Sequence, residues 1–431
     1  MTAPRILVVG GGAGGLPLVT FLGKRLGRKQ LADVVLIDSN TNHVWKPRYH
    51  EVATGAIDAD LDAVDFRAHA RLNHYRFVPG ALTAVDTAAR SVTLAAVVGA
   101  NGQTVLPERT MDYDYLVLAL GSQSNDFNTP GVREHAMFMD SRRQAERFRE
   151  RFLNACMQAD FENRPLSIAI VGGGATGVEL AAELHHAVSM LKLYGHEHLD
   201  RRRLNVHLIE ATSRLLPALP EKVSSSARSH LERLGVKVHT DTLVECAEAG
   251  AFVVKGGERI EGDLLVWAAG VKAPDVLSSL QGFSFNRIGQ IDVEPTLQAR
   301  GHEQVYVIGD SASCILPGSE RPLPPRAQTA QQMAHHLAKS LEGVVLRGRT
   351  PTPFVYRDRG SLVSLSKYSS VGTLIPTAKG SNLFIEGALA RWAYISLYRM
   401  HQAALYGWPR TVMLLIAGRF NRLVRPRLKL H

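Results

Sequence analysis

Two glycine-rich turns, Gly10–Gly15 and Gly172–Gly177, carry the clearest chemical signal in this sequence, because each fits the pattern G-x-G-x-x-G between an apolar run and a helix-like segment. In this pattern the first glycine makes a tight turn, the second lets a pyrophosphate approach the backbone, and the third lets helix and strand pack closely. The helix N-terminus then faces the phosphates. One match alone is often a plain structural turn, but two matches in the same context predict two dinucleotide-binding sites. The residues predicted to form them are Gly10, Gly12, Ala13, Gly14, Gly15, Gly172, Gly174 and Gly177.

A carboxylate follows each glycine turn at the end of a second predicted strand, Asp38 in the first case and Glu210 in the second. A carboxylate at this point accepts hydrogen bonds from ribose hydroxyls and repels a 2′-phosphate. We therefore expect Asp38, with the adjacent Ser39, and Glu210 to bind ribose, and we expect NADH rather than NADPH as the second nucleotide. A solvated acid at a strand end is the alternative for both, and Arg214 near Glu210 leaves NADPH open.

Three further apolar segments end in glycine and are predicted to be strands. They are Tyr115–Leu120 before Gly121, Leu264–Ala269 before Gly270, and Val305–Ile308 before Gly309-Asp310. Open parallel sheets bind ligands at the carboxyl ends of their strands, so we expect cofactor contacts there. Asp310 would bind the ribityl hydroxyls of a flavin or form only an Asx turn, and the two dinucleotide folds favour the flavin. The residues predicted to bind cofactors at these ends are Gly121, Ala269, Gly270, Gly309 and Asp310.

The order of these segments predicts an α/β fold with two Rossmann-like dinucleotide-binding domains, the second inserted in the first. A C-terminal membrane-associating α module follows. We place the FAD-binding domain at 1–114 and 292–345, the NADH-binding domain at 115–291, and the membrane-anchoring module at 346–431.

Composition excludes several classes of protein. The chain has 431 residues, of which 45% are hydrophobic and 21% charged, as in ordinary globular proteins. Three cysteines spread over this length and no CxxC pair exclude a disulfide framework and make a structural zinc or other metal site unlikely. The first residues lack the features of a secretion signal, so we expect an intracellular protein. The formal net charge is +10, but residues 387–431 hold eight basic residues and no acidic one, which indicates a basic tail rather than a nucleic-acid-binding face.

The sequence resembles the flavoproteins with two dinucleotide-binding domains and, within them, the type II NADH dehydrogenases, the single-chain NADH:quinone oxidoreductases of respiratory membranes. The likeness covers essentially the whole chain. The two glycine turns, Tyr115–Gly121 and Gly309-Asp310 are shared with many flavoprotein reductases. More specific segments are HVWKPRYHEVATGAID (His43–Asp58), LLVWAAGV (Leu264–Val271), RAQTAQQMA (Arg326–Ala334) and the tail with GSLVSLSKYSSVG and RWAYISLYRMHQAALYGWPRT.

This resemblance implies a non-covalent FAD, NADH as hydride donor and a ubiquinone-type quinone as acceptor, in a reaction that pumps no protons. It implies that Gln328 and Gln332 lie near the flavin and the quinone, with Ala327 at the flavin, whereas Met333 gives no support because some members carry a further glutamine there. It also implies that Glu179 faces the nicotinamide and that Lys46 and Pro47 pass over the flavin. Without the resemblance, the two glutamines would be an exposed polar helix face and Glu179 a surface acid.

Two other functions remain as alternatives. A sulfide:quinone reductase-like flavoenzyme would need two cooperating cysteines, and Cys156 and Cys314 form the only plausible pair, although small core residues are the simpler interpretation of all three cysteines. A flavoprotein whose NADH-reduced state controls a binding partner is the second alternative. The glutamine segment and the tail favour the dehydrogenase.

The C-terminal tail predicts attachment to a membrane surface without crossing it. An apolar stripe at helical spacing runs along one side of 412–424, with arginines away from it. The longest uncharged stretch in 387–431 has ten residues, whereas spanning takes about 20. Eight cations suit an anionic lipid surface, so we expect a peripheral, monotopic enzyme at the cytoplasmic face of a bacterial inner membrane, near the quinone pool. A helix docked on the protein body or on a second copy, in a homodimer, is the rival. The stripe is Val412, Leu415, Ile416, Phe420, Leu423 and Val424.

Overall fold

The computed structural model describes residues 3–99, 101–196, 198–199, 201–375, 383–424 and 428–429. The contacts within the chain divide it into two compact units, each built from three segments. The first unit comprises Met1–Trp45, Ala63–Gln123 and Val271–Arg357. The second comprises Lys46–Asp62, Ser124–Gly270 and Asp358–His431.

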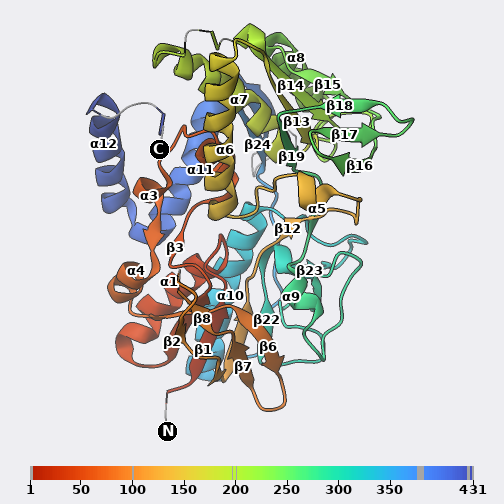
Figure 1. Cartoon of the computed structure of the whole chain (residues 1–431). Coiled ribbons are helices and arrows are strands. Elements are labelled where there is room, and N and C mark those ends of the chain that lie inside the picture. Colours follow the sequence, from red (N-terminus) through yellow and green to blue (C-terminus); the bar gives the residue numbers. More distant parts are fainter. Residues whose placement is uncertain are drawn as a thin grey trace. The chain divides into compact units, whose positions relative to one another are not determined.

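A five-stranded sheet forms the centre of the first unit, with the order β22-β11-β1-β2-β5 and parallel pairing throughout (Figure 1). Its middle strands are short apolar runs that are buried along nearly their whole length, as expected of a parallel sheet covered on both faces. Along the chain, β22 comes after all the strands of the second unit's parallel sheet. The chain order is therefore that of one Rossmann fold inserted in another. The strands are β1 (Arg5–Val9), β2 (Asp33–Asp38), β5 (Arg76–Pro79), β11 (Tyr115–Leu118) and β22 (Val305–Val307).

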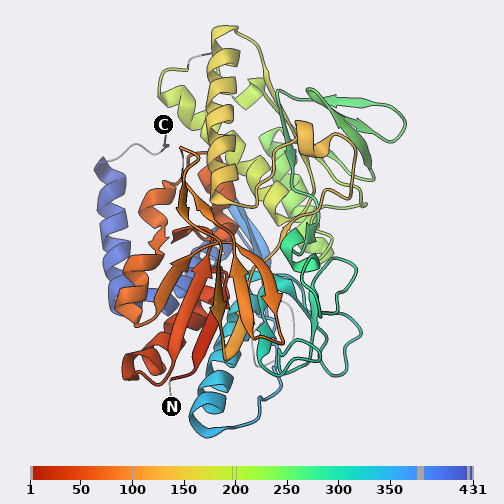
Figure 2. The same ribbon diagram turned by 60° about the horizontal axis from the view of Figure 1, so that its bottom comes forward.

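Helices and small sheets complete the first unit, and its red and orange strands run side by side in Figure 2. α10 packs on α1, and the buried face of α10 repeats at helical spacing from Ala330 through Met333 and Leu337 to Leu341. The helices are α1 (Gly15–Arg25), α4 (Phe66–Asn73), α9 (Asp275–Ser278) and α10 (Ala327–Arg347). The minor strands are β3 (Asn42–His43), β4 (Val64–Asp65), β6 (Leu82–Asp86), β7 (Ser91–Leu94), β8 (Val97–Val98), β9 (Thr104–Leu106), β10 (Arg109–Asp112), β21 (Ile291–Val293) and β23 (Ala312–Cys314).

The second unit contains a four-stranded parallel sheet of order β15-β14-β13-β19 and a three-stranded antiparallel sheet of order β16-β17-β18. The predicted α/β class with two parallel sheets is therefore confirmed. The parallel strands are β13 (Leu166–Val171), β14 (Leu204–Ile209), β15 (Lys237–His239) and β19 (Leu264–Trp267). The antiparallel strands are β16 (Val244–Glu248), β17 (Ala251–Val254) and β18 (Arg259–Glu261), and the helices beside the parallel sheet are α7 (Ala175–Leu193) and α8 (Glu221–Leu234).

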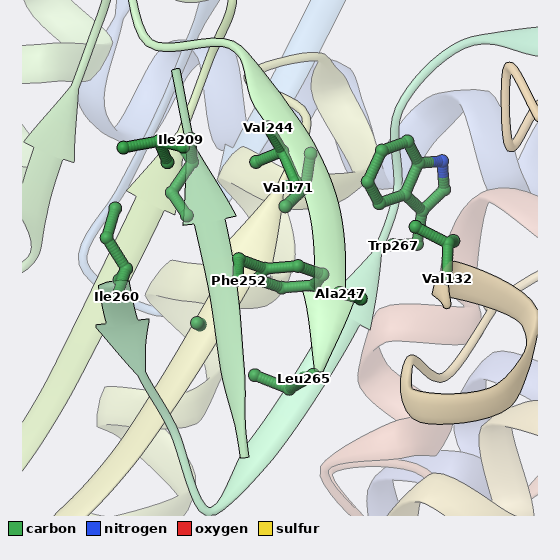
Figure 3. Close-up of a cluster of buried hydrophobic side chains, with 11 residues drawn as sticks. Val132, Val171, Ile209, Val244, Ala247, Phe252, Ile260, Leu265 and Trp267 are labelled. Carbon is green, nitrogen blue, oxygen red and sulfur yellow. The ribbon is translucent and has the colours of Figure 1, made fainter. Parts of the chain in front are cut away.

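A buried apolar cluster holds these two sheets together (Figure 3). Phe252 of β17 packs against Trp267 of β19, with ring centroids 6.1 Å apart, and Trp267 lies beside Val132 in Figure 3. Val171 and Ile209, at the ends of β13 and β14, belong to the same cluster. The core therefore fixes the two strand ends from which the second glycine turn and Glu210 emerge.

Part of the rest of the second unit packs on α7 and α8. A hairpin sheet of order β24-β25-β26 contacts both helices and α11, while α2 contacts α6 and α7. The strands are β24 (Gly360–Leu365), β25 (Ser369–Leu374) and β26 (Leu383–Glu386). The helices are α2 (Tyr49–Ala53), α3 (Ala59–Asp62), α5 (Val132–His135), α6 (Arg142–Phe161), α11 (Gly387–Tyr406) and α12 (Trp408–Val424). Two short strands, β12 (Gln123–Ser124) and β20 (Val271–Lys272), lie where the chain passes between units.

The predicted C-terminal helix is present as α12, and the described part of its apolar stripe is exposed. The exposed residues of the stripe are Val412, Leu415, Ile416 and Phe420. The Phe420 residue is 65% exposed to solvent. The predicted stripe also included Leu423 and Val424, whose side chains lie outside the described residues. The same holds for the side chain of the basic residue Arg422 and for the whole of Arg425 and Arg427. Among the described residues, no helix is both long enough and apolar enough to cross a bilayer.

Candidate functional site

The first glycine turn lies in the first unit, between β1 and α1, and each of its glycines meets a different constraint. Gly10 has φ +103° and donates its N–H to the Ile37 carbonyl at 2.8 Å, and a Cβ on Gly10 would lie 2.3 Å from the Ala119 carbonyl oxygen. A Cβ on Gly15 would lie 1.8 Å from the Gly10 oxygen. Gly12 differs from both, because no atom lies within 4 Å of where its Cβ would be. The backbone at Gly12 is thus open to a ligand.

The start of α1 is suited to an anion. Its N-cap is Gly14, and no side chain caps the first N–H groups of the helix. Such groups, together with the helix dipole, favour phosphate. Ala13 is half-buried, and a Cβ on Gly14 would come within 3.3 Å of the Ala330 carbonyl of α10, so glycine there allows α1 and α10 to approach. The predicted phosphate-binding residues of the first turn are therefore gathered at one helix end.

Asp38 at the end of β2 is tied to this turn. Its Oδ2 accepts the Gly11 N–H at 2.7 Å, and its Oδ1 accepts the N–H of Asn40 at 2.7 Å. Burial raises the pKa of Asp38, although these two hydrogen bonds act in the opposite direction. The ring of His43 also hydrogen-bonds the Gly11 backbone, and burial lowers its pKa to about 4, so this histidine is neutral at pH 7. Ser39 is exposed next to Asp38.

Asp310 and its hydrogen-bond partners form a second polar group at the carboxyl end of the first sheet. The Ser122 hydroxyl donates to Asp310 Oδ2 at 2.7 Å, and Gln290 donates to the Asp310 carbonyl at 2.8 Å. Gly309 has φ +70°, and its N–H donates to the sulfur of Met333 at 3.2 Å. Gly121 also has a positive φ and no atom within 4 Å of a Cβ. Met333, which gave no support from sequence, therefore ties the Gly309-Asp310 turn to α10.

The second glycine turn repeats the first within the second unit. Gly172 has φ +114° and donates to the Ile209 carbonyl at 2.8 Å, and a Cβ on Gly177 would lie 2.0 Å from the Gly172 oxygen. Gly174 is the N-cap of α7, and no side chain caps the first N–H groups of this helix. A Cβ added to Gly174 would have no atom within 4 Å. This turn is therefore also open at its middle glycine and at the helix N-terminus.

Glu210 takes the place of Asp38 in the second turn. Its Oε2 accepts the Gly173 N–H at 2.7 Å, and its Oε1 accepts the N–H and the hydroxyl of Thr212, each at 2.8 Å. The guanidinium of Arg214 donates to the carbonyls of Leu219 and Pro217, both at 2.9 Å. These bonds hold Arg214 to its own loop. Ala269 is half-buried and Gly270 exposed at the end of β19, where the Trp267 indole donates to the Asn125 carbonyl at 2.8 Å.

Glu179 of α7 is 6% exposed, so it is not the surface acid that its sequence context alone suggested. Its Oε1 accepts the Ser364 N–H at 2.9 Å, and its Oε2 lies 3.3 Å from Nδ1 of His50. Burial raises the pKa of Glu179 to about 8, so the carboxyl group is protonated at pH 7. A neutral carboxyl group in a buried site can hold a proton and release it.

The two glutamines of α10 lie one turn apart and are half-buried. Gln332 Nε2 donates to the Arg357 carbonyl at 2.8 Å, and its Oε1 accepts the Arg357 N–H at 3.0 Å. The amide of Gln332 thus holds the backbone at Arg357. Ala327 is the first residue of α10.

Lys46 and Pro47, predicted to pass over the flavin, are exposed residues of the second unit. There, the Lys46 ammonium lies 3.6 Å from Asp140 Oδ1.

The cysteines are free thiols, and Cys156 and Cys314 are fully buried. Burial raises the pKa of Cys314 to about 11 and that of Cys156 further still, so both are protonated at pH 7. A protonated, buried thiol is a poor nucleophile. The interpretation of these two residues as core residues is thus the better one, and Cys246 is half-buried.

Sequence reasoning missed the side chains that surround Glu179. His50, Arg48 and Glu51 lie within the motif HVWKPRYHEVATGAID, and Glu183 follows Glu179 by four residues. The four-residue spacing of two glutamates in VELAAEL was the available signal. It was hidden because glutamates at this spacing usually line a solvated helix face.

The comparisons with known proteins agree with this arrangement. A family model described as pyridine nucleotide-disulphide oxidoreductase matches residues 4–334. A Haemophilus influenzae protein named type II NADH:quinone oxidoreductase is 41% identical over 99% of both chains. A Plasmodium falciparum NDH2 structure in complex with NADH has a TM-score of 0.82 at 18% identity and covers 99% of this chain and 100% of that one. The sulfide:quinone oxidoreductase structure from Aquifex aeolicus, at 16% identity, has a TM-score of 0.71 and covers 94% of this chain and 92% of that one, and so shares the fold alone. The chain therefore belongs to the pyridine nucleotide-disulphide oxidoreductase family and, within it, to the type II NADH:quinone oxidoreductases.

Proposed function

We propose that this chain is an NADH:quinone oxidoreductase that holds FAD in its first unit and binds NADH in its second. FAD, when bound, accepts a hydride from NADH and passes two electrons to the quinone. The observation that carries the proposal is the repeated turn, in which an open glycine, an uncapped helix N-terminus and a strand-end carboxylate occur twice. The protein's own contribution is to bind and orient the two nucleotides.

The residues of the first unit fit FAD. The open backbone at Gly12 and the N-terminus of α1 would receive the pyrophosphate, and Asp38 would bind the ribose. Asp310, already oriented by Ser122, would bind the ribityl hydroxyls. The predicted bounds, FAD at 1–114 and 292–345 and NADH at 115–291, differ from these units because β11 pairs with β1 in the first sheet, so we assign FAD and NADH by unit instead.

The residues of the second unit favour NADH over NADPH. Glu210 is fixed by Gly173 and Thr212 beside the turn, where its carboxylate would accept hydrogen bonds from a ribose diol and repel a phosphate. Arg214, the cation nearest in sequence, is engaged with two backbone carbonyls of its loop. Gly172, Gly174 and Gly177 would position the pyrophosphate, and Ala269 and Gly270 the nicotinamide half.

We propose roles in the reaction for Glu179, Gln328 and Gln332. Glu179 would hold a proton in its protonated carboxyl group. Gln328 would donate a hydrogen bond to a quinone carbonyl, and Gln332 would serve the same site while holding the backbone at Arg357. Lys46 and Pro47 would cover the flavin.

An anaerobic titration tests the function. NADH should bleach the flavin absorbance of the yellow, purified protein, and a short-chain ubiquinone added afterwards should restore it with formation of one quinol per flavin. NADPH, at the same concentration, should bleach the flavin much more slowly. A protein that NADH reduces but that no quinone reoxidises would contradict the proposal.

We also propose that α11 and α12 bind the enzyme to an anionic lipid surface at the cytoplasmic face of the bacterial inner membrane, where quinone is dissolved. Trp392 and Trp408 keep 73% and 63% of their surface exposed, and α12 exposes Met413 and Ile416 as well. Exposed tryptophans beside apolar and cationic side chains suit a bilayer interface. Tyr398 differs from the tryptophans because it is buried within the unit.

Sedimentation with vesicles of phosphatidylglycerol and phosphatidylcholine tests the lipid proposal. Replacing Ile416 and Phe420 by Ser should release the protein from the vesicles, whereas Phe161→Ser, on α6 and 91% exposed, is the matched control and should leave binding intact. If the α12 variant still sediments but changes from a dimer to a monomer in light scattering, the exposed face is a contact between two copies of the chain instead.

A further inference from the structure

Two buried glutamates lie one turn apart on α7. Glu179 is 6% exposed and Glu183 is 4% exposed. Residues four apart lie on the same face of a helix with roughly 6 Å between their Cβ atoms. Unpaired buried carboxylates are costly, so each group must be neutral or have a partner. Their surroundings decide which.

Glu179 is a neutral acid in contact with a neutral base. Burial raises its pKa to about 8, and the charges of Glu51 and Glu183 act in the same direction, while the Ser364 N–H and the Tyr394 hydroxyl of α11 act against them. Burial lowers the pKa of His50 to about 4. At pH 7 the 3.3 Å contact between Oε2 of Glu179 and Nδ1 of His50 therefore joins two neutral groups and is not an ion pair.

Glu183 is poised closer to pH 7. Burial and the charge of Glu51 raise its pKa to about 7, whereas the Ser366 hydroxyl, Arg48 and Lys367 limit the rise. Both protonation states of Glu183 are thus populated near neutral pH. A group that gains and loses a proton at the working pH is suited to pass protons on.

Glu51 is excluded from this role by Arg48. The Arg48 guanidinium donates to both oxygens of Glu51, at 3.0 and 2.8 Å, donates to Asp62 at 2.9 Å, and lies 4.6 Å from the ring centre of Tyr398. Burial alone would raise the pKa of Glu51, but the charge of Arg48 and its hydrogen bonds outweigh burial and lower it. Glu51 stays ionised, and its charge helps to keep protons on the two glutamates of α7.

The hairpin of β24 and β25 lies along both glutamates and leads outward. The Ser364 N–H binds Glu179, Ser366 faces Glu183, and Lys367 in the following turn is exposed. The same hairpin therefore lies against both glutamates and reaches the protein surface at Lys367.

The proposed reaction needs a supply of protons, because NADH, one proton and a quinone give NAD⁺ and a quinol. The hydride brings both electrons and one hydrogen, so one proton per turnover comes from water. We propose that Glu183 is the relay residue that returns a proton to Glu179 after Glu179 has given its own to a quinone oxygen. In each cycle the O–H bond of Glu179 breaks as the quinol O–H bond forms. The proton of Glu183 then moves to Glu179, and water near Lys367 reprotonates Glu183.

This inference rests on the proposed function, and the time course of quinol formation tests it. Protein reduced beforehand with NADH is mixed with a short-chain ubiquinone and excess NADH. In Glu183→Gln, Glu179 begins protonated, so the first quinol should form at the normal rate and later ones more slowly by on the order of 10²-fold. The unmodified enzyme should show no such burst. The burst amplitude of the variant should fall as the pH rises through about 8, where Glu179 loses its stored proton.

Three comparisons separate a relay from a structural role. Glu183→Asp should restore much of the later rate, and Glu232→Gln, an exposed glutamate of α8, should give a linear time course. Ferricyanide, which takes electrons without protons, should be affected far less than quinone by Glu183→Gln. Equal losses with both acceptors, or a linear time course at the unmodified rate, would overturn the relay. An unmodified enzyme that forms no quinol would instead overturn the proposed function.

Discussion

The two glycine turns have nearly the same backbone but differ in the side chains around them. In both turns a backbone N–H donates to a strand-end carboxylate at 2.7 Å, from Gly11 to Asp38 in the first unit and from Gly173 to Glu210 in the second. The first turn has, in addition, the Phe66 ring directly beneath Gly11 and the ring of His43 on its backbone. In the second turn, Leu215 and Glu210 lie against Gly173, and the Leu216 N–H donates to the Gly173 carbonyl at 2.8 Å.

The two units also differ at the ends of β22 and β19. In the first unit, β22 ends at Asp310, which is oriented by Ser122 and held to α10 through Gly309 and Met333. In the second unit, β19 ends at Ala269 and Gly270, with no acid at that point in the sequence. The additional acid at the end of β22 suits a nucleotide that stays bound, and its absence after β19 suits one that enters and leaves in each turnover.

Replacing the third glycine of each turn should have the largest effect. Gly15→Ala places a Cβ 1.8 Å from the Gly10 oxygen, which should cost about 3 kcal/mol of folding free energy and yield protein without flavin. Gly177→Ala creates the same clash at 2.0 Å, yet should yield yellow protein that NADH fails to reduce. Flavin absorbance and calorimetry measure both. Loss of flavin in both variants would remove the distinction between the two turns.

Replacing the middle glycine should separate ligand from fold. A Cβ added at Gly12 would have no protein atom within 4 Å, so the folding free energy of Gly12→Leu should change by less than about 1 kcal/mol while flavin content falls steeply. Gly174→Leu should keep the flavin and raise the KM for NADH. Thermal unfolding of flavin-free protein is the control, and full flavin occupancy in Gly12→Leu would show that the pyrophosphate lies elsewhere.

Changing Glu210 should alter the choice of nucleotide by about tenfold, or about 1.4 kcal/mol. Glu210→Gln removes the charge and keeps one acceptor oxygen, which can serve Gly173 or Thr212 but not both, so it should narrow the preference for NADH and loosen one contact of the turn. Glu210→Arg should narrow it further or reverse it. The ratio of kcat/KM for NADH and NADPH measures this, and equal values in the unmodified enzyme would exclude the charge as the cause.

The two glutamines of α10 should show the smallest effects on ligand binding. Gln328→Leu should weaken quinone binding by about 1 kcal/mol for a lost hydrogen bond. Gln332→Leu removes both bonds to Arg357 and should lower the free energy of unfolding by roughly 2 kcal/mol as well. Quinone KM and urea unfolding should be measured together. An unfolding free energy in Gln332→Leu equal to that of the unmodified protein would contradict the structural role of Gln332.

The sequence predicted the parts of the fold that depend on local patterns. The strands before the glycine turns and the helices after them follow from β-branched runs and helical periodicity, and the chain order placed β22 back in the first sheet. The Asp38 and Glu210 contacts follow because a strand end and a tight turn leave little freedom. These features depend on residues close together in a known motif.

The environment of Glu179 could not be predicted in the same way. It depends on His50 from α2, Ser364 from β24 and Tyr394 from α11, which lie more than a hundred residues away from Glu179 in sequence. Burial of Glu183 likewise follows from the packing of the β24 and β25 hairpin on α7. Pattern analysis reads which face of a helix is apolar, but not which acids a distant hairpin will cover.

The two faces of α11 have different roles. One carries exposed side chains that we propose bind lipid, and the other carries side chains that contact buried ionisable groups. One side of this helix exposes Trp392, while the other carries Tyr394 and Tyr398, which contact Glu179 and Arg48. Cutting the chain at residue 386 would therefore not give a simple water-soluble version of the enzyme. It would admit water to Arg48 and Glu179, and an assay of the shortened protein would report altered acid–base chemistry as if it were lost attachment. For a soluble form that keeps its proton chemistry, the outward side chains of α11 and α12 should be exchanged one by one and the helices kept.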